Sequence, residues 1–395
     1  MKNSIILDPA PDKIRQNWIP YLNGFRAVAI LLVISCHFGI SSELTGWVSI
    51  HPWYGYFLNG ILGVQIFFVL SGYLITYLLI QEEERCGKIS AGKFIARRLL
   101  RIMPLFLIYL LSIYGLYVSG VIKSSMNQNS FLAALFWFYD YQSCYLITSP
   151  WIEHLWSLSF ELKFYFVWLI IIICLKRKWW RYIVITLMVV APISRYFLSD
   201  FPLNDFNEYS KNHLQHRLQH MFHTGMDTIL IGCSLALWQY HPRLTRFFQI
   251  FRSPIWLTIA SGYIFIIAED LRIRLNDSWI LPLKMSLDVL VLGFIVGWII
   301  HHPQRWPGRL LENRVLQHIG TLSYSIYIWQ QPFIFVLPNN YPIFIYLGIP
   351  ITYLVALISY HYIEMPINRF RGRFRTDPMR IDVAFGKFSP QPGQS

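Results

Sequence analysis

The stretch "RAVAILLVISCH", residues 26–37, has an arginine and a histidine at its ends, and eight of the ten residues between them are Ala, Val, Ile or Leu. Such an apolar stretch is typical of a helix that crosses a lipid bilayer. Arg26 and His37 are 11 positions apart, so on a helix they would share one face, with about 16 Å of rise between them. Ionisable groups inside a bilayer are costly and usually belong to a pathway or a reactive site. The simpler alternative is that Arg26 reaches the lipid headgroups and His37 lies at the interface.

The composition places the whole chain in the membrane. Of 395 residues 55% are hydrophobic and 14% are charged, and the mean hydropathy is +0.40. Soluble proteins carry roughly a quarter charged residues. We therefore expect an all-α polytopic membrane protein with one membrane domain at residues 19–368. A short cytoplasmic segment at 1–18 would precede it. The first helix of the membrane domain would be retained rather than cleaved as a signal peptide. A basic, poorly ordered cytoplasmic tail would follow at 369–395.

Ten apolar stretches predict transmembrane helices, at residues 19–40, 57–80, 102–122, 155–175, 180–198, 221–240, 254–269, 279–301, 319–338 and 343–363. With both termini in the cytoplasm, the inner segments hold 25 of the 34 Lys and Arg residues and the outer segments hold five, as the positive-inside rule requires. The net charge of +13 thus reflects topology rather than nucleic-acid binding. The stretch 131–147, interrupted by Asp140, could be an eleventh span or an interfacial segment. The charge distribution favours the second interpretation, at the outer face.

No metal site is predicted. The five cysteines form no CxxC pair. Four histidines of "HLQHRLQHMFH" share one helical face: His213, His216, His220 and His223. Zinc is an alternative, but no acidic or cysteine partner has suitable spacing. The preferred interpretation is a polar surface that could contact an extracytoplasmic substrate.

A carboxylate is predicted at the depth of His37. In "HLWSLSFELKFYFVW", residues 154–168, Glu161 is about two turns from the outer face. A carboxylate beside an imidazole suits general-base chemistry, because it fixes the tautomer and stabilises the imidazolium. A structural pair with Lys163 is disfavoured, since residues two apart on a helix do not face each other. Asp227 lies at similar depth on the sixth span and is a second polar candidate.

Two arginines lie at the mouth of the third span. In "KFIARRLLRIMP", residues 93–104, Arg98 and Arg101 are three apart and share a face. Arginine clusters bind phosphates through forked donors. The alternative is that these charges set topology or bind anionic lipid.

Seven motifs follow one another along the chain: "YLNGFRAVAILLVISCHF" (21–38), "GVQIFFVLSGYLIT" (63–76), "RRLLRIMP" (97–104), "LWSLSFELKFYFVW" (155–168), "HTGMDTILIGCSLA" (223–236), "GTLSYSIYIWQQP" (320–332) and "SYHYIEMPINRF" (359–370). In this ordered set the chain resembles the acyltransferase-3 family of integral membrane O-acyltransferases, which modify bacterial surface glycans. The family patterns include LDGLRGIAILLVVLYHF, FFVLSGYLIT and WSLSVEEQFYLLW. No single motif is decisive, but the ordered set covers nearly the whole chain.

Four positions depart from the family pattern. Asn23 replaces an aspartate, His223 stands where an arginine is usual, Lys163 where glutamine is common, and Gln330 where SYSLYLWH has a histidine. Glutamine donates and accepts hydrogen bonds but does not titrate. Gln330 is therefore not expected to supply a second base.

The resemblance implies transfer of an acyl group, most often acetyl, from acyl coenzyme A to a sugar hydroxyl in the bacterial cytoplasmic (inner) membrane. His37 would be the general base or a transient acyl carrier, with Arg26 and Glu161 beside it. Arg98 and Arg101, together with Arg26, would bind the coenzyme. Further substrate-lining candidates are Ser71, Tyr73, Trp156, Ser157, Asp227 and Tyr324. The acceptor could be an O-antigen, an exopolysaccharide, a signalling oligosaccharide, peptidoglycan or an antibiotic.

Two other classes of function compete with this one. A transporter or flippase could use intramembrane polar groups as a relay, namely Arg26, His37, Glu161, Asp227 and Asp288. The absence of an internal repeat and the paired arginines at a cytoplasmic mouth argue against it. A non-enzymatic membrane partner or sensor has only the histidine-rich stretch in its favour. Coenzyme A binding would discriminate among the three.

Overall fold

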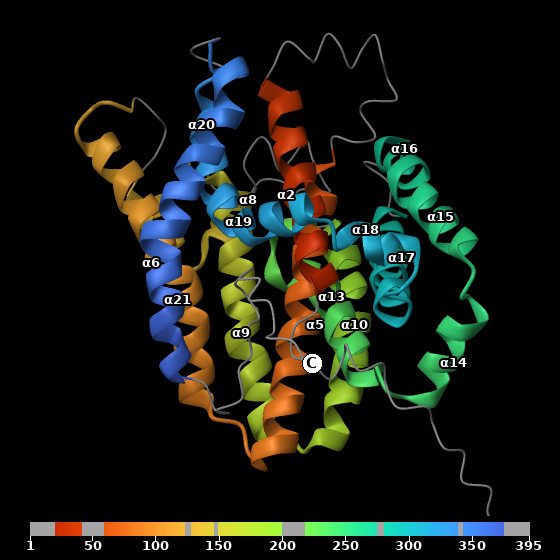
Figure 1. Cartoon of the computed structure of the whole chain (residues 1–395). Helices are drawn as coiled ribbons and strands as arrows, with labels where there is room; N and C mark the ends of the chain where they lie inside the picture. Colours follow the sequence, from red (N-terminus) through yellow and green to blue (C-terminus); the bar gives the residue numbers. More distant parts are fainter. Residues whose placement is uncertain are drawn as a thin grey trace, which may run out of the picture.

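The computed structural model describes residues 20–41, 59–122, 128–145, 149–199, 218–274, 280–338 and 343–374, and within these ranges the structured segments are helical. Figure 1 shows long helices standing side by side, with α14 to α16 along one edge and α6, α20 and α21 along the opposite edge. The long helices are α2 (Pro20–Ser41), α5 (Gly60–Cys86), α6 (Ala91–Val118), α9 (Trp156–Cys174), α10 (Arg177–Ser199), α13 (Phe222–Trp238), α17 (Leu281–His301), α19 (Arg314–Gln330) and α20 (Phe344–Ser359).

Shorter elements connect or extend these helices. They are α7 (Gln128–Leu135), α8 (Tyr139–Tyr145), η1 (Glu153–Leu155), α14 (Pro242–Ile250), α15 (Pro254–Gly262), η3 (Tyr263–Ile267), α16 (Ala268–Arg274), α18 (Trp306–Leu311), η4 (Gln331–Val336), η5 (Tyr360–Glu364), α21 (Met365–Arg371) and η6 (Gly372–Phe374). Three of them, η3, η4 and η5, are π-helices that continue α15, α19 and α20. Wide turns of this kind occur frequently at functional sites.

The structure confirms an all-α polytopic membrane protein. Among the described residues seven helices are long and apolar enough to cross a bilayer, and the bent pair 242–250 and 254–267 would make eight. The helix α13 has 17 residues, and neither α13 nor α19 is in that group. The predicted number of ten crossings and the cytoplasmic termini therefore stay predictions. Of the tail predicted at 369–395, residues 369–374 are helical and the remainder lies outside the described residues.

The stretch 131–147 does not form one long helix in its described part. It contains most of α7 and all of α8, which are eight and seven residues long. Trp137 separates them with a φ of 62°, a left-handed conformation that interrupts a right-handed helix. Neither helix is long enough to cross a bilayer.

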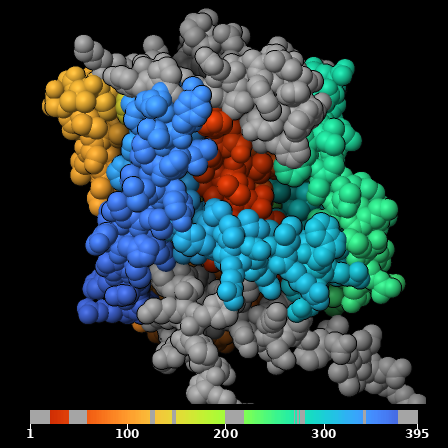
Figure 2. Space-filling view, turned by 45° about the horizontal axis from the view of Figure 1, so that its top comes forward, coloured from red at the N-terminus to blue at the C-terminus, as the bar shows by residue number. Residues whose placement is uncertain are grey.

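The helices α2, α5 and α13 form the centre of the bundle because small residues let their backbones approach. A Cβ atom at Gly72 of α5 would lie 1.9 Å from the Ile229 carbonyl oxygen of α13. A Cβ at Gly232 would lie 2.0 Å from the Val69 carbonyl oxygen. Close crossings at small residues are the usual packing of helices in lipid. In Figure 2, α2 is seen at the centre of the face, between the blue α20–α21 segment and the green α14–α16 segment.

The ends of α5 follow from its sequence. The Asn59 side chain caps the first turn by accepting a hydrogen bond from the Leu62 amide at 2.8 Å. Gly87 ends the helix with a φ of 67°, which glycine adopts without steric cost. The short turn that follows leads directly into α6, so the arginines at the start of α6 lie beside α5.

Candidate active site

A cavity lies inside the bundle. Together with the open space at its mouth it has a volume of about 770 Å³. It is lined by Arg26, Val64, Phe67, Phe68, Leu70, Ser71, Leu74, Ile75, Arg98, Arg101, Ile102, Ser157, Leu158, Glu161, Tyr165, Ser323, Tyr324 and Tyr327. These residues come from α2, α5, α6, α9 and α19. Seven of the predicted site residues therefore line the same cavity: Arg26, Ser71, Arg98, Arg101, Ser157, Glu161 and Tyr324.

Glu161 is held in the cavity wall by two hydroxyl groups. The Ser71 hydroxyl of α5 and the Tyr165 hydroxyl one turn along α9 both donate to its Oε1 atom. Among the described residues no hydrogen bond joins Glu161 to His37, so the predicted carboxylate–imidazole contact is not formed. The carboxylate is instead a fixed negative group at the wall of the cavity.

Lys163 points away from Glu161, as the helical spacing predicted. Its ammonium donates to the Asp140 carboxylate of α8 and lies over the Tyr141 ring at 4.4 Å. Burial raises the pKa of Asp140 to about 6, while the Lys163 ammonium acts in the opposite direction. The contact fastens α8 to α9 outside the cavity.

Three guanidinium groups give the cavity a positive charge. The Arg98 side chain is buried, with its guanidinium carbon 5.4 Å from the Phe94 ring centre and 5.7 Å from that of Tyr165. Its Nε has no hydrogen-bond partner among the described residues. Arg26 lies close enough to Arg101 and Glu161 for their charges to interact. With three cations against one lining carboxylate, the cavity suits an anionic ligand.

Glu364 was not predicted as a site residue, although it lies in the motif "SYHYIEMPINRF". It accepts a hydrogen bond from the Ser325 hydroxyl and interacts electrostatically with Arg26 and Arg101. The signal in the sequence was an acidic residue directly after an apolar span and before Met365–Pro366. The π-helix η5 brings it back toward α19, which the residue spacing alone does not reveal.

Tyr327 was also missed and joins two walls of the cavity. Its hydroxyl lies 2.5 Å from the Ser157 Oγ and 2.8 Å from the His154 carbonyl oxygen. Tyr324, one helical turn earlier, donates to the Ile102 carbonyl oxygen at 2.6 Å. Because residues three apart share a helical face, the predicted lining residue Tyr324 could have pointed to Tyr327.

His37 does not line this cavity. Its Nδ1 lies 2.6 Å from Oε1 of Gln330 at the end of α19, and its ring centre is 5.2 Å from that of Phe335. His154 is buried and interacts electrostatically with His37. Neither ring nitrogen of His154 has a hydrogen-bond partner among the described residues. His37 lies about three turns further along α2 than Arg26, next to the Gln330 amide and the Phe335 ring.

Three other predicted residues lie elsewhere. Tyr73 is buried and donates to Gln239 Oε1 at 3.0 Å. Trp156 stacks on His220 with ring centres 3.9 Å apart. It lines a second, smaller cavity, of about 340 Å³ with the open space at its mouth, which shares Val64 and Phe68 with the first. Asp227 is enclosed between helices and lines neither cavity.

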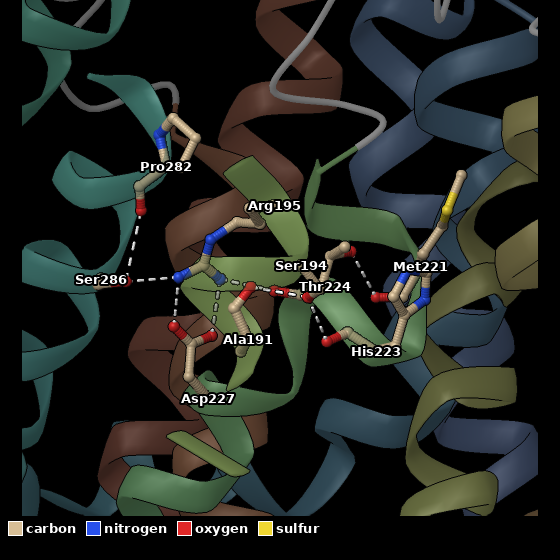
Figure 3. Close-up of polar contacts among 9 residues, drawn as sticks. All are labelled: Ala191, Ser194, Arg195, Met221, His223, Thr224, Asp227, Pro282 and Ser286. Carbon is tan, nitrogen blue, oxygen red and sulfur yellow. Dashed lines mark hydrogen bonds and ion pairs between the residues drawn. The ribbon is translucent and has the colours of Figure 1, made fainter. Parts of the chain in front are cut away.

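Figure 3 shows how Asp227 is enclosed. The Arg195 guanidinium of α10 donates to both oxygens of Asp227, at 3.0 and 2.6 Å. It also donates to the Thr224 carbonyl oxygen and the Ser286 hydroxyl, each at 2.5 Å. This cluster ties together α10, α13 and α17. In the sequence, Arg195 is a charge inside the predicted span 180–198.

The histidine-rich stretch is only partly described. His213 and His216 lie outside the described residues. His220 stacks on Trp156, and His223 Nδ1 lies 3.1 Å from the Tyr141 hydroxyl. Over the described ranges no group of three His, Cys, Asp or Glu residues could hold a metal ion.

Comparison with known proteins identifies relatives of this architecture. The chain is 31% identical over 374 residues to O-acetyltransferase OatA of Staphylococcus aureus, covering 89% of this chain and 57% of that protein. A second Staphylococcus aureus protein, also named as an O-acetyltransferase, is 28% identical over 383 residues, covering 90% of this chain and 58% of its own length. The chain thus spans less than two thirds of the length of these curated relatives. No solved structure matches.

The family comparison covers nearly the whole described bundle. The acyltransferase-3 family, described as an acyltransferase domain, matches residues 19–361. This range begins just before α2 and ends inside η5, so it includes every residue that lines the large cavity. The chain belongs to the acyltransferase-3 family of membrane proteins, as its motif order predicted.

Proposed function

We propose that the chain is a membrane O-acyltransferase that moves an acetyl group from acetyl coenzyme A to a hydroxyl of an extracytoplasmic or lipid-linked glycan. The observation that carries the proposal is the large cavity, where three arginines and one fixed carboxylate meet between five helices. The names of the relatives, which specify O-acetyl transfer, favour acetyl over longer acyl groups.

The arginines suit the phosphate end of the donor. Arg98 and Arg101 lie within about the first three turns of α6, next to the turn that the charge distribution assigns to the cytoplasm. Guanidinium groups bind phosphate oxygens through two parallel hydrogen bonds. The buried, unpartnered Nε of Arg98 leaves a donor that an anionic ligand could satisfy, since unpaired buried donors are costly.

The thioester end of the donor would lie further along α2. Arg26 is at the cavity, and His37 is about 16 Å further along the same helix. The long pantetheine arm of coenzyme A could extend along this face of α2 and bring the thioester to His37. With the predicted topology, His37 is in the outer half of the bilayer, where a glycan acceptor could reach it.

The proposed reaction needs one base and no oxidant or metal. The His37 imidazole takes the proton of the acceptor hydroxyl as its oxygen attacks the thioester carbonyl carbon. The tetrahedral intermediate collapses, the carbon–sulfur bond breaks, and the imidazolium returns the proton to the coenzyme A sulfur. The products are the acetyl ester and free coenzyme A. Alternatively the His37 imidazole attacks the thioester carbonyl carbon first and expels the coenzyme A thiolate, which leaves a transient acyl-imidazolium. The acceptor hydroxyl oxygen then attacks the acyl carbon, the carbon–nitrogen bond breaks, and the hydroxyl proton passes to the thiolate.

Labelled donor tests this function. Inside-out membrane vesicles with wild type or His37→Ala at equal expression would receive acetyl-labelled coenzyme A, and glycan and lipid-linked sugar fractions would be collected. His361→Ala is the matched control, because His361 is exposed and its ring contacts the Leu357 carbonyl oxygen one turn earlier, outside the cavity. We expect label in wild type and in the control, and none in His37→Ala. Equal labelling in all three would remove His37 from the chemistry, and no labelling with any acyl-CoA and acceptor fraction would contradict the function.

The transporter alternative has weaker support. Two of the acidic groups predicted for a relay are paired: Asp227 with Arg195, and Asp288 with Lys284 at 2.7 Å. Paired carboxylates in a packed interior are poor proton carriers, since giving up the charge leaves the cation uncompensated. Uptake of labelled glycan without acetyl coenzyme A would favour the transporter.

A further inference from the structure

We propose that Gln330 and Gln331 are positioning residues that hold neutral His37 in one tautomer, with the proton on Nδ1 and the lone pair on Nε2. This inference rests on the proposed function only for its consequence, the use of Nε2 as the base. The tautomer itself follows from hydrogen bonds between His37, the two glutamines and Pro150.

The direction of the hydrogen bonds is fixed at the Pro150 end. Gln331 Nε2 lies 2.7 Å from the Pro150 carbonyl oxygen. A backbone carbonyl can only accept, so the amide nitrogen of Gln331, and not its oxygen, must face it. With the nitrogen fixed in this way, the Gln331 Oε1 atom is an acceptor on the other side of the amide.

The next contact transmits this direction to His37. Gln330 Nε2 donates to Gln331 Oε1 at 3.2 Å, because two oxygens would repel at this distance. Gln330 Oε1 is therefore the atom that faces His37, 2.6 Å from Nδ1. An amide oxygen only accepts, so Nδ1 must carry a hydrogen. In neutral His37 the lone pair is then on Nε2.

Burial makes this arrangement costly to reverse. Gln330 is 0% exposed and Gln331 is 2% exposed. Flipping either amide would place two like groups face to face, and each lost hydrogen bond of a buried group costs about 1–3 kcal/mol. Because glutamine does not titrate, the direction of the hydrogen bonds is the same at every pH at which the protein is folded.

The π-helix explains how neighbouring glutamines can cooperate. On an α-helix consecutive side chains point about 100° apart and do not contact each other. Gln330 is the last residue of α19, and Gln331 is the first residue of the π-helix η4. Their amides meet at this change of helix type, and Phe335 of the same π-helix packs against the His37 ring.

The first test is spectroscopic and does not depend on activity. Protein with ¹⁵N-labelled histidine would be studied in lipid nanodiscs over a pH series, and the His37 signals would be assigned by their loss in His37→Gln. At pH values where His37 is neutral, we expect Nδ1 to show a protonated, pyrrole-type shift and Nε2 a pyridine-type shift. Wild type with the proton on Nε2 would overturn the proposal, whatever the activity.

Variants then test the two glutamines. Gln330→Leu removes the acceptor, and Gln331→Leu removes the anchor that orients Gln330; both should admit the second tautomer. Gln317→Leu is the matched control: it lies on the same helix, and Gln317 also donates to a backbone carbonyl, that of Leu311, at 2.7 Å. The control should keep the wild-type spectrum. Unchanged spectra in both Gln330→Leu and Gln331→Leu would contradict the proposal.

Activity measurements on the same variants test the consequence of the His37 tautomer for acetyl transfer. We expect kcat for acetyl transfer to fall about 10²-fold in Gln330→Leu, the lower end of a general base's contribution, and less in Gln331→Leu. The KM for acetyl coenzyme A should stay at the wild-type value, since neither glutamine lines the donor cavity. A tautomer shift with unchanged kcat would overturn the positioning role. No transfer in wild type would count against the proposed function alone, because the spectra still report the tautomer.

Discussion

Arg195 and Asp227 face each other across α10 and α13 through two parallel hydrogen bonds, with side chains that are 1% and 3% exposed. The guanidinium is further held by α17 through Ser286. The pair therefore fastens three helices at one point. We therefore expect Asp227 to act in the scaffold, which the following variants test.

Asp227→Leu should lower the free energy of unfolding by about 3–5 kcal/mol, because it leaves a buried guanidinium without its counter-charge. The measurement is reversible unfolding in mixed micelles. Asp270→Leu is the control: Asp270 pairs with Arg274 on the surface of α16, and such pairs contribute about 0.5 kcal/mol or less. If Asp227→Leu kept wild-type stability but lost acetyl transfer, Asp227 would belong to the reaction and not to the scaffold.

The crossing of α5 and α13 gives a second prediction. Gly72→Ala would place a methyl group 1.9 Å from a backbone oxygen of α13, so the helices must separate. We expect the free energy of unfolding, measured in mixed micelles, to fall by about 1–3 kcal/mol, which is typical of overpacking. Gly115→Ala on α6 meets nothing within 4 Å and should stabilise α6 by about 0.5–1 kcal/mol. Equal stability of the two variants would mean that α5 and α13 do not touch as described.

The donor cavity can be tested with two substrates that share the acetyl-pantetheine portion and differ in the nucleotide with its phosphates. Wild type should use acetyl coenzyme A at lower concentrations than acetyl-pantetheine, which lacks the nucleotide and its phosphates. Arg98→Gln should raise the KM for acetyl coenzyme A roughly tenfold or more, as expected for one lost charged hydrogen bond. The KM for acetyl-pantetheine should hardly change.

Arg246→Gln is the control for this substrate comparison, because Arg246 is exposed and outside the cavity. It should leave both KM values unchanged. An equal rise for both substrates in Arg98→Gln would show that Arg98 supports the cavity wall instead of binding phosphate.

Position along each helix could be predicted from the sequence, but direction around each helix could not. Arg26 and Glu161 were predicted from their place along apolar spans and Arg98 from its place before the third span, and the cavity brings the three together. Asp227 was predicted at a depth similar to that of Glu161, yet it faces Arg195 of α10. Which neighbour a helix face meets depends on packing of distant segments, and one sequence does not contain that information.

Some of the other differences between the predicted site and the observed cavity follow from helix geometry. Ser71 and Tyr73 are two residues apart on α5, so their side chains point about 200° apart and could not line one cavity. Ser71 lines it, and Tyr73 packs with Tyr77 on the other side. In contrast, the meeting of Gln330 and Gln331 needs a π-helix, which breaks the 3.6-residue period on which such arguments depend.

The last prediction concerns Glu161, whose replacement by glutamine should affect donor binding and the rate of transfer differently. Glu161→Gln keeps an oxygen that can accept from Ser71 and Tyr165. It removes the one acidic group among the described residues that line the cavity with its three arginines. The phosphates of the donor should bind at least as well, so KM for acetyl coenzyme A should stay equal or fall. In the proposed reaction this wall holds the donor whose thioester reaches His37, so a displaced donor should lower kcat about tenfold, equivalent to about 1.4 kcal/mol. Steady-state kinetics with both substrates varied would measure the two effects, with Glu312→Gln, outside the cavity, as the control. A higher KM with unchanged kcat would instead place Glu161 among the donor-binding groups, because only uniform binding would then have been lost.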